Sequence, residues 1–398
     1  MTLQEKKALR AQKKAEKARK KEEAYYLASQ WTLMARKLGK HTLARISLVI
    51  LGVMYFCALF ADFIAPSNLT AYNANTANLP PTQVHFFHEG EFVGPFIYQS
   101  EWQTLKLSVK EMMQAKKEAK ERGEEFSTRQ IVTDTSKPMK IKFFVEGVEY
   151  KWLGLVKSNI HLFGVEEGGN LFLFGSDGMG RDLFSRILLG SQVSLTIPFA
   201  GTAISFVLGI LLGSISGYFG GKIDNVIQRI IEVLNSLPSL PLWMALSAAI
   251  PPNIPPVQMY LMITIILSLI GWTGLARVVR GKFMSLKNED FVVAARLAGV
   301  SDMKIILKHL VPGFMSYLIV SLTMGIPGMI IGETSMSFLG LGIQAPATSW
   351  GVLLKEAQSV TNIASHPWCL IPLIFVVVAV LAFNFLGDGM RDAADPYK

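Results

Sequence analysis

Long runs of uncharged, mostly apolar residues dominate the second half of the sequence. No charged side chain occurs in the 31 residues from Ser191 to Gly221 or in the 44 residues from Val233 to Ala276. A helix needs roughly 20 apolar residues to cross about 30 Å of hydrocarbon, and only a bilayer favours runs of this length. The pattern predicts six membrane-spanning helices, near residues 46–64, 192–213, 234–250, 257–276, 311–333 and 368–386.

Prolines divide the longest of these runs. Residues 251–256 contain four prolines, which remove backbone donors and predict a short exposed turn between the third and fourth helices. Pro238 and Pro241 lie inside the third predicted helix, where we expect them to kink the helix or to shift its start.

The segment between the first and second predicted helices has a different composition. Residues 66–175 are polar and charged and are interrupted by prolines, which is typical of a small folded domain. Residues 101–125 are rich in helix formers and predict a helix with a solvated face. Residues 140–152 predict two short strands joined near Glu146 and Gly147. The expected fold class is therefore an all-α polytopic membrane protein with a small α+β insertion between its first two transmembrane helices.

Composition and charge narrow the class further. Hydrophobic residues make up 51% of the chain and charged residues only 17%, whereas a soluble protein carries about 25% charged residues. Residues 1–45 hold 13 Lys and Arg against 4 acidic residues, which accounts for the whole net charge of +9. Because this basic tail directly precedes a membrane helix, we interpret it as a determinant of orientation and exclude nucleic acid as a partner.

The distribution of Lys and Arg predicts the orientation in the membrane. With the N-terminus inside, residues 277–310 carry seven basic residues, whereas the two short outer connections, 251–256 and 334–367, carry Lys355 alone. We therefore expect a multi-pass protein of the cell membrane with both termini in the cytosol, an uncleaved first helix and an extracytoplasmic insertion. Apolar residues just before the first helix indicate either an interfacial amphipathic helix or an extension of that helix: Leu27, Trp31, Met34 and Leu38.

These boundaries divide the chain into four parts. They are a basic tail with an interfacial helix at 1–45, the first transmembrane helix at 46–65, the insertion at 66–175, and a core with five transmembrane helices at 176–398. The core contains a cytosolic connection that we name loop 277–311. Cys57 and Cys369 both lie in apolar runs, so neither a disulfide framework nor a cysteine metal site is predicted.

Loop 277–311 carries the most informative local pattern. Residues 289–298 predict a short helix that Gly299 ends, and Ser301 with Asp302 can begin a second helix before Pro312. Two short helices that meet at a glycine, with small alanine side chains beside it, can form a compact knob that enters a groove on a soluble partner. An ordinary interfacial connector has the same pattern, and the residues alone leave both interpretations open.

Several segments resemble a known family. The stretch Val293–Gly299, followed by His309–Pro312, resembles the EAA loop of ABC-importer permeases. Further segments in the same order and spacing are similar to the C-type permease subunit of oligopeptide and dipeptide importers, namely Gly175–Asp182, Gly217–Asp224, Ala276–Gly281, Ser337–Gly342 and Asn384–Asp392. Together they cover residues 175–398 and the first helix.

The resemblance implies a type I importer permease that forms half of a translocation pathway for oligopeptides and works by alternating access. It implies a homologous second permease subunit, two ATPase subunits that use ATP and Mg, and an extracytoplasmic substrate-binding protein as partners, besides the lipid bilayer. It assigns no catalytic residue, metal ligand or bound cofactor to this chain. The residues implied in ATPase coupling are Phe291, Val293, Ala294, Ala295, Arg296, Gly299, Ser301 and Asp302.

The sequence departs from the family in three places. Val293 stands where the family has Glu, which removes a charge from the expected contact with the ATPase, whereas Ala295 and Gly299 keep the expected shape. Ser176 replaces the usual Thr and keeps the hydroxyl. The insertion at 66–175 is longer than is usual for this subunit.

The same residues leave other functions open. Dipeptides, nickel or oligosaccharides are alternative cargoes, and an ATP-independent secondary transporter is an alternative of a different class. The chain has no phosphate-binding loop of its own and no zinc-protease motif. Residues 213–217 only partly resemble a nucleophile elbow, so we interpret them as small residues for close helix packing. Glu333 is the one ionisable residue near the interior of a predicted helix; we favour a solvated helix end over a residue that lines the substrate pathway.

Overall fold

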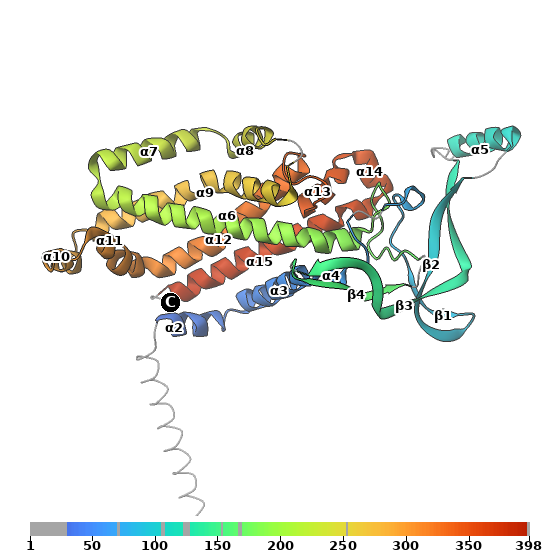
Figure 1. The fold of residues 1–398 in the computed structure, drawn as a ribbon, viewed down its shortest axis with the longest axis horizontal. Coiled ribbons are helices and arrows are strands. Elements are labelled where there is room, and N and C mark those ends of the chain that lie inside the picture. Colours follow the sequence, from blue (N-terminus) through green and yellow to red (C-terminus); the bar gives the residue numbers. More distant parts are fainter. Residues whose placement is uncertain are drawn as a thin grey trace, which may run out of the picture. The chain divides into compact units, whose positions relative to one another are not determined.

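The structure is a computed structural model that describes residues 30–69, 72–104, 108–121, 128–152, 154–165, 169–251 and 254–395 (Figure 1). The chain divides into two compact units. One unit contains residues 1–51, 286–325 and 381–398, and the other contains residues 52–285 and 326–380. Residues 1–29 of the basic tail, which include Leu27, lie outside the described residues.

Five segments of the described chain are long and apolar enough to cross a membrane. They are α3 (Thr42–Leu59), α6 (Leu183–Phe219), α9 (Pro256–Leu286), residues 302–338, which end in α12 (Met315–Phe338), and residues 367–394, which end in α15 (Ile371–Ala394). These agree with five of the six predicted helices, although α6 and α9 extend well beyond the expected limits. Hydropathy defines only the part of a helix inside the bilayer, whereas the helical backbone continues past it.

The third predicted helix, at 234–250, is not a single straight helix. The structure has α7 (Gly221–Ser236) and α8 (Ser239–Ala248), which are bent by 89° at the break between them. Pro238 is the N-cap of α8, so the chain breaks where a proline prevents the helix from continuing, as the sequence predicted. The pair counts as a sixth candidate span only if the two helices are taken together.

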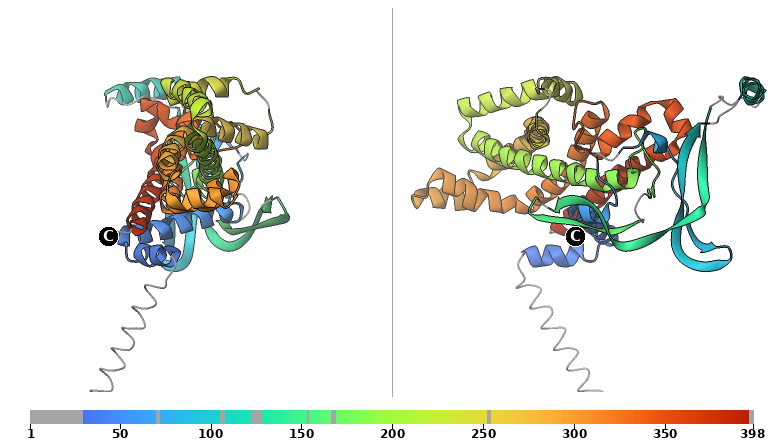
Figure 2. Two further views of the ribbon diagram at one scale, coloured as in Figure 1. Left: turned by 90° about the vertical axis from the view of Figure 1, so that its left-hand side faces the viewer. Right: turned by 45° about the vertical axis from the view of Figure 1, so that its right-hand side comes forward.

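Helices α6 and α9 approach each other closely through small residues (Figure 2). A side chain at Gly213 would come within 2.5 Å of the Ala276 carbonyl oxygen, and one at Gly217 within 2.6 Å of the Arg280 carbonyl oxygen. The predicted packing role of residues 213–217 is therefore confirmed, because only glycine permits this approach. The same unit has an apolar core that includes Ile197, Ile263, Leu267, Met329 and Met336.

The insertion contains a four-stranded antiparallel sheet in the order β1 (Val84–His88), β2 (Glu91–Thr104), β3 (Arg129–Trp152) and β4 (Val156–Val165). The first part of β3 pairs with β2 and the second part with β4. The prediction of two short strands joined near Glu146 and Gly147 is wrong, because β3 continues through this point with a register irregularity between Glu146 and Tyr150. His161 packs against Gly147 there, and a side chain at Gly147 would meet its ring at 2.6 Å.

The predicted helix over residues 101–125 is shorter than expected. Helix α5 covers Val109–Glu121, whereas residues 101–104 belong to β2. Cross-strand pairing with β3 extends to Thr104, and this pairing prevails over helix propensity. The unit of residues 52–285 and 326–380 also contains several short elements: α4 (Ala61–Ile64), η1 (Ala74–Thr76), α13 (Trp350–Leu354), η4 (Lys355–Gln358), α14 (Val360–Ser365) and η5 (Pro367–Leu370).

The unit that contains residues 286–311 of the loop also contains α2 (Gln30–Leu38) and the end of α15. Residues 39–41 separate α2 from α3, so the residues before the first span form a helix of their own. Lys37 Nζ donates a hydrogen bond to the Asp395 carbonyl oxygen at 2.8 Å, and the Met34 sulfur accepts one from Ser316 Oγ at 3.8 Å. These contacts join α2 to the start of α12 and to the C-terminal end of α15.

Candidate functional site

Loop 277–311 folds as two short helices joined at Gly299, as the sequence predicted. Helix α10 (Asp290–Leu297) ends in a left-handed Gly299, whose φ is +74°. The Val300 amide donates to the Ala295 carbonyl at 3.1 Å and the Gly299 amide donates to the Arg296 carbonyl at 3.0 Å. This pair of bonds is the Schellman motif, which requires a residue with positive φ at this position. Gly299 therefore fixes the direction in which the chain leaves α10.

The second helix of the loop is short and irregular. Helix α11 (Asp302–Ile305) begins after Ser301, but the Ser301 side chain makes no capping hydrogen bond. A π-helical turn over Ile306–Leu310 and a 3₁₀ turn over Val311–Phe314 then lead into α12. Pro312 lies in this last turn and has no backbone N–H, which accounts for part of the irregularity.

The loop carries both buried and exposed apolar side chains. Val292, Ile305, Ile306 and Leu310 are buried and anchor it. Phe291, Val293 and Met303 are exposed, and Leu297 is 84% exposed. Of the two alanines that were predicted to border the knob, Ala294 is exposed and Ala295 is half-buried. The loop therefore presents an apolar surface around Gly299, and a side chain added at Gly299 would meet no other atom within 4 Å. Arg296, Ser301 and Asp302 are also exposed.

A half-buried ion pair lies near the C-terminal end of α9, where this helix forms the first part of loop 277–311. Arg280 of α9 donates two hydrogen bonds to the Asp224 carboxylate of α7, from Nε and from Nη2, each at 2.6 Å. Ser216 of α6 donates to the same carboxylate at 2.5 Å, and Gln228 donates to Ser216 at 3.1 Å. This two-pronged geometry is the strongest form of an Arg–carboxylate pair. It joins α6, α7 and α9 about one and a half turns before α9 ends, taking 3.6 residues per turn.

Glu333 is fully buried, so the interpretation as a solvated helix end is wrong. Its carboxylate accepts hydrogen bonds from Ser337 at 2.8 Å and from Ser194 at 3.3 Å, and Ser349 donates a third. Ser194 also accepts the Trp350 amide at 3.0 Å. Within the described part of the chain Glu333 pairs with no cation. Three hydroxyls from α6, α12 and the N-cap of α13 therefore meet at one carboxylate.

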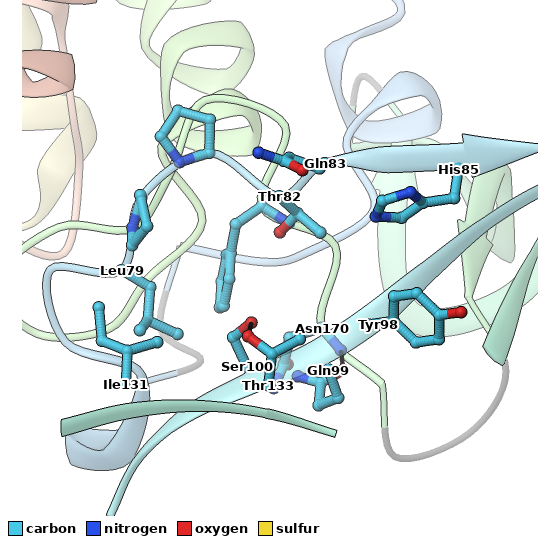
Figure 3. Close-up of a pocket in the computed structure, with 13 residues that line it drawn as sticks. Leu79, Thr82, Gln83, His85, Tyr98, Gln99, Ser100, Ile131, Thr133 and Asn170 are labelled. Carbon is cyan, nitrogen blue, oxygen red and sulfur yellow. Dashed lines mark hydrogen bonds between the residues drawn. The ribbon is translucent and has the colours of Figure 1, made fainter. Parts of the chain in front are cut away.

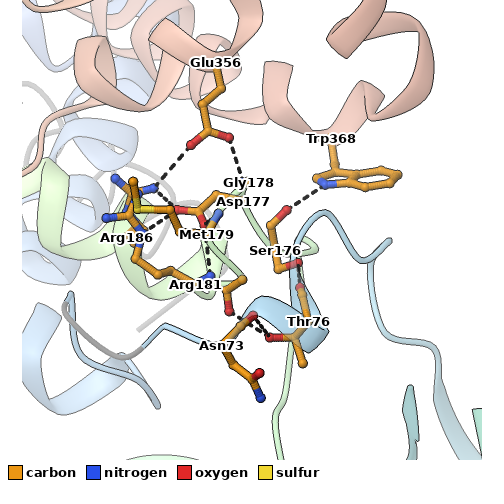
Figure 4. A network of polar contacts seen from close by, with 11 residues as sticks. Asn73, Thr76, Ser176, Asp177, Gly178, Met179, Arg181, Arg186, Glu356 and Trp368 are labelled. Atoms are coloured by element: carbon orange, nitrogen blue, oxygen red, sulfur yellow. Dashed lines mark hydrogen bonds and ion pairs between the residues drawn. The ribbon is translucent and has the colours of Figure 1, made fainter. Parts of the chain in front are cut away.

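A further polar network surrounds Asp177, which lies a few residues before α6 (Figure 4). Asp177 Oδ1 accepts the Met179 amide at 2.8 Å and the Arg181 amide at 3.0 Å. Its other oxygen accepts the guanidinium groups of Arg181, at 2.7 Å, and of Arg186. Glu356 accepts the Gly178 amide at 3.1 Å, and its other oxygen lies 3.9 Å from Arg186 Nη1. Asp177 and Arg186 are both buried.

Ser176 connects this network to the insertion. Its hydroxyl donates to the Thr76 carbonyl at 2.5 Å and accepts the Leu79 amide at 2.7 Å, and its carbonyl accepts the Trp368 indole at 3.0 Å (Figure 4). The side chain that replaces the family's Thr thus uses its hydroxyl as donor and as acceptor. Segments 73–79, 175–186 and 356–368 are held together at this point.

Burial changes the acidity of two carboxyl groups here. Burial raises the pKa of Asp182, the N-cap of α6, to about 6, although amide and hydroxyl donors of Ser185 oppose the shift. The pKa of Glu356 is also raised, first by burial and then by the negative charge of Asp177. Both groups therefore hold a proton more readily than an exposed carboxyl does.

Two hollows border these elements. A cavity of about 540 Å³ is lined by Arg181, Arg186, Lys355, Gly340 and residues 343–348, and it reaches Ser337, the residue that donates to Glu333. Figure 3 shows a second one, of about 240 Å³, between residues 79–85 and strands β2 and β3. Its lining includes His85, Tyr98 and Asn170 but no charged side chain. The cavity of about 540 Å³, which we name the charged cavity, therefore lies beside both the Glu333 cluster and the Asp177 network.

Sequence reasoning found some of these residues and missed others. The eight predicted coupling residues all lie in loop 277–311. Glu333, the ninth residue that the sequence singled out, lies apart from them and accepts hydrogen bonds from serines. The pairing of Asp224 with Arg280 and of Asp177 with Arg186 was missed. Each of these four charged residues lies at or near the end of an uncharged run, and this position was the signal that could have indicated them. Their pairing could not be predicted in this way, because Asp224 and Arg280 are 56 positions apart and Asp177 and Arg186 are 9 positions apart.

Two family descriptions match the chain. Residues 209–397 match the binding-protein-dependent transport system inner membrane component. Residues 29–81 match the N-terminal transmembrane domain of oligopeptide transport permease C. The two matches include α2, α3 and the chain from the last third of α6 to residue 397, and they leave residues 82–208, with the whole sheet, outside.

Individual relatives agree with these matches. The chain is 42% identical over 224 residues to the oligopeptide transport system permease protein OppC of Haemophilus influenzae, covering 56% of this chain and 70% of that protein. It is 40% identical over 224 residues to the dipeptide transport system permease protein DppC of Bacillus subtilis, covering 56% and 68%. The glutathione transport system permease protein GsiD of Escherichia coli is 42% identical over 223 residues, covering 56% and 71%.

Among solved structures, an inward-facing MetNI methionine ABC transporter is similar to 53% of this chain and 96% of its own, with 18% identity and a TM-score of 0.43. This likeness is too distant to carry an argument about the site.

Proposed function

Since this chain belongs to the family of inner-membrane components of binding-protein-dependent transport systems, we propose that it moves oligopeptides across the membrane as one half of an ATP-driven pathway. The chain is a membrane-embedded permease subunit of an ABC importer and is not itself an enzyme. The cargo is inferred from the relatives, which transport oligopeptides and dipeptides. The observation that carries the proposal is the exposed apolar knob at Gly299, inside the segment that matches the family.

The knob fits a partner that supplies the energy. Exposed Phe291, Val293 and Leu297 surround a backbone turn that Gly299 keeps free of side-chain bulk. Val293 and Leu297 are four positions apart and lie on one side of this short helix, which is suited to a hydrophobic groove. We assign this groove to an ATPase subunit that binds ATP and Mg, with Ala294, Ala295, Arg296, Ser301 and Asp302 completing the contact. Val293 then contributes an apolar contact where other members contribute a charge.

The complete importer is expected to contain further subunits. One chain forms half of a pathway, so a homologous permease faces it, and two ATPase subunits occupy the two coupling loops. An extracytoplasmic binding protein delivers the cargo. The excess of Lys and Arg in loop 277–311 and in the basic tail supports an orientation with both termini in the cytosol. In this orientation the insertion and the charged cavity beside Asp177 lie on the side from which cargo arrives.

Movement of the knob has a defined route into the membrane helices. Loop 277–311 is continuous with α9 on one side and leads through short turns into α12 on the other. The Arg280–Asp224 pair holds the end of α9 against α7 and α6, so that displacement of the loop displaces these helices together. Because packed helices have discrete arrangements, ATP-driven closure of the partners switches them between outward-open and inward-open states.

The hydroxyl cluster at Glu333 lies between α12 and α6, two of the helices that we expect to move when the states switch. It ties α12 to α6 and to α13 through one carboxylate. The adjacent cavity reaches Ser337, which places Glu333 one hydrogen bond away from space that cargo can occupy. We propose that Glu333 supports the wall of the pathway beside the entrance and does not contact peptide directly.

One observation favours a second candidate, an ATP-independent carrier. A buried carboxylate without a cation partner in the described chain is a group that proton-coupled transport could use. The experiment that separates the two is purification of the assembly in mild detergent, reconstitution in vesicles, and uptake of a labelled oligopeptide with and without ATP. An ATP-driven importer retains ATPase subunits on purification and requires ATP for uptake. Uptake that follows a proton gradient in the absence of ATP and of any ATPase subunit would identify a carrier.

A further inference from the structure

The hairpin formed by β3 and β4 contacts the end of the first membrane helix. Trp152 Nε1 donates a hydrogen bond to the Leu59 carbonyl oxygen at 2.9 Å, and Leu59 is the last residue of α3. The Trp152 ring stacks on Phe60 with centroids 5.4 Å apart, and Phe144 lies 6.3 Å from Phe63. The carbonyls at a helix end have no partner within the helix, so Trp152 satisfies one at the end of this candidate span.

Helix α3 itself presents an apolar surface next to this contact. Val49, Val53 and Phe56 are exposed, and Phe56 packs on Phe60 with centroids 4.7 Å apart. Aromatic rings therefore continue from the exposed face of α3 through Phe60 to Trp152. Since α3 is a membrane helix, this row leads from the hydrocarbon to its boundary, where Trp is enriched because its ring is apolar and its N–H is polar.

The tip of the hairpin has two chemically different faces. Trp152 pairs with Val156, and Ile160 lies on the same face because it follows Val156 by four positions in β4. Val156 is 55% exposed, and Leu155 in the turn is 84% exposed. Lys151 pairs directly with Lys157 on the opposite face. Like charges placed opposite each other destabilise a hairpin unless an anion lies nearby.

Water is a poor environment for this tip. It would surround the exposed apolar side chains, and it would leave the like-charged ammonium groups of Lys151 and Lys157 at directly opposite positions. A lipid interface suits both faces, because acyl chains accept the apolar side chains while lysines extend to the phosphates. The location at the end of α3 makes the tip continuous with the membrane surface that the family assignment already requires.

We propose that the β3–β4 hairpin inserts its turn into the membrane interface at the Leu59 end of α3, with Leu155 and Val156 among the acyl chains and Lys151 and Lys157 on lipid phosphates. The hairpin thereby anchors the inserted sheet to the bilayer. The inference rests on the membrane location of the family and is independent of the cargo, of the energy source and of which side faces the cytosol.

The test places a nitroxide on the tip in the assembled importer. Cys57 and Cys369 are first replaced by Ala, and Leu155→Cys or Val156→Cys is labelled in nanodiscs of phosphatidylethanolamine and phosphatidylglycerol. We expect collisions with oxygen, which concentrates in lipid, to exceed collisions with a water-soluble nickel chelate severalfold. Phe92→Cys is the control, because Phe92 is 70% exposed in the β1–β2 hairpin and is not part of the tip. It should favour the nickel chelate.

Two results would overturn the proposal. If the labels at Leu155 and Val156 collide mainly with the nickel chelate, the tip lies in water. If they are protected from both reagents, another protein surface covers it. Lys151→Glu combined with Lys157→Glu provides a second variant that keeps the apolar face: it should shift the Val156 label toward the nickel chelate while ATP-driven peptide uptake persists. An unchanged label in this variant would remove the lysines from the contact and contradict the anchoring arrangement.

Discussion

Loop 277–311 and the network around Asp177 solve opposite structural problems. The loop leaves apolar side chains such as Phe291 and Leu297 exposed and obtains its shape from backbone bonds at Gly299. The network buries charged groups and satisfies both oxygens of Asp177 with four donors. A surface that meets another protein keeps apolar side chains exposed, whereas a junction between segments of one chain pairs its charged groups with one another. Substitutions should therefore damage assembly and coupling in the first region and folding in the second.

The largest effect is expected from Asp177→Ala. This change leaves the Arg186 guanidinium buried without its main partner, and breaking a buried pair in this way costs about 3–5 kcal/mol. We expect a strongly reduced melting temperature and yield of the purified assembly. Arg229→Ala is the control, because the Arg229–Glu232 pair is exposed and such pairs contribute less than about 1 kcal/mol. Equal melting temperatures for the two variants would show that the network does not stabilise the fold.

Glu333 provides the next test. Glu333→Ala leaves the hydroxyls of Ser194, Ser337 and Ser349 without their common acceptor, at a cost of about 1–3 kcal/mol. Glu333→Gln keeps an acceptor oxygen, so ATP-driven uptake should persist in this variant at a reduced rate. Thermal unfolding and uptake by reconstituted assemblies are the measurements. Complete loss of uptake in a well-folded Glu333→Gln protein would indicate that the carboxyl group must exchange a proton, as the carrier hypothesis requires.

Gly299→Leu tests the other side of the comparison. A non-glycine residue at this φ costs about 1–2 kcal/mol, which is too little to unfold the assembly, but the added side chain projects from the knob. We expect the variant to remain in the membrane and to hydrolyse ATP while peptide uptake falls severalfold. Gly90→Leu is the matched control, because Gly90 also has positive φ and open surroundings but lies between β1 and β2. If Gly299→Leu takes up peptide as well as Gly90→Leu does, the coupling role of the knob is wrong.

The smallest effect should be a pH dependence at Glu356. Because the pKa of Glu356 is raised in the folded protein, the folded state binds this proton more tightly than the unfolded state does. The resulting stabilisation is present below the ordinary pKa of Glu and is lost as pH rises through the raised value. The melting temperature of Glu356→Gln relative to the native protein should therefore increase with pH across this range. A difference that does not change with pH would contradict the shift.

Patterns along the chain predicted the local features well. The transmembrane helices follow from hydropathy, the break at Pro238 from its missing donor, and the end of α10 from Gly299. Each of these depends on residues within one or two turns. The resemblance to peptide-importer permeases also came from short motifs, and the family matches confirm it.

Features that depend on distant residues were not predictable in the same way. The strand irregularity near Gly147 arises because His161, from the next strand, occupies the space beside it. Glu333 is buried because serines from α6 and from the N-cap of α13 reach it. Sequence position placed Glu333 at a helix end, where solvent is the default. The polar networks are likewise fixed by which segments meet, and a single sequence contains no record of these pairs.

The most direct test of the account is cross-linking from the exposed face of α10. Ala294→Cys, in a chain whose Cys57 and Cys369 are replaced, would be treated with a short thiol-to-amine cross-linker in the reconstituted importer, and the adduct identified by mass spectrometry. The account predicts a cross-link to an ATPase subunit, with a yield that changes when ATP is added. Recovery of the importer without any ATPase subunit, or modification of Ala294→Cys only by reagents added on the side of the peptide, would contradict it.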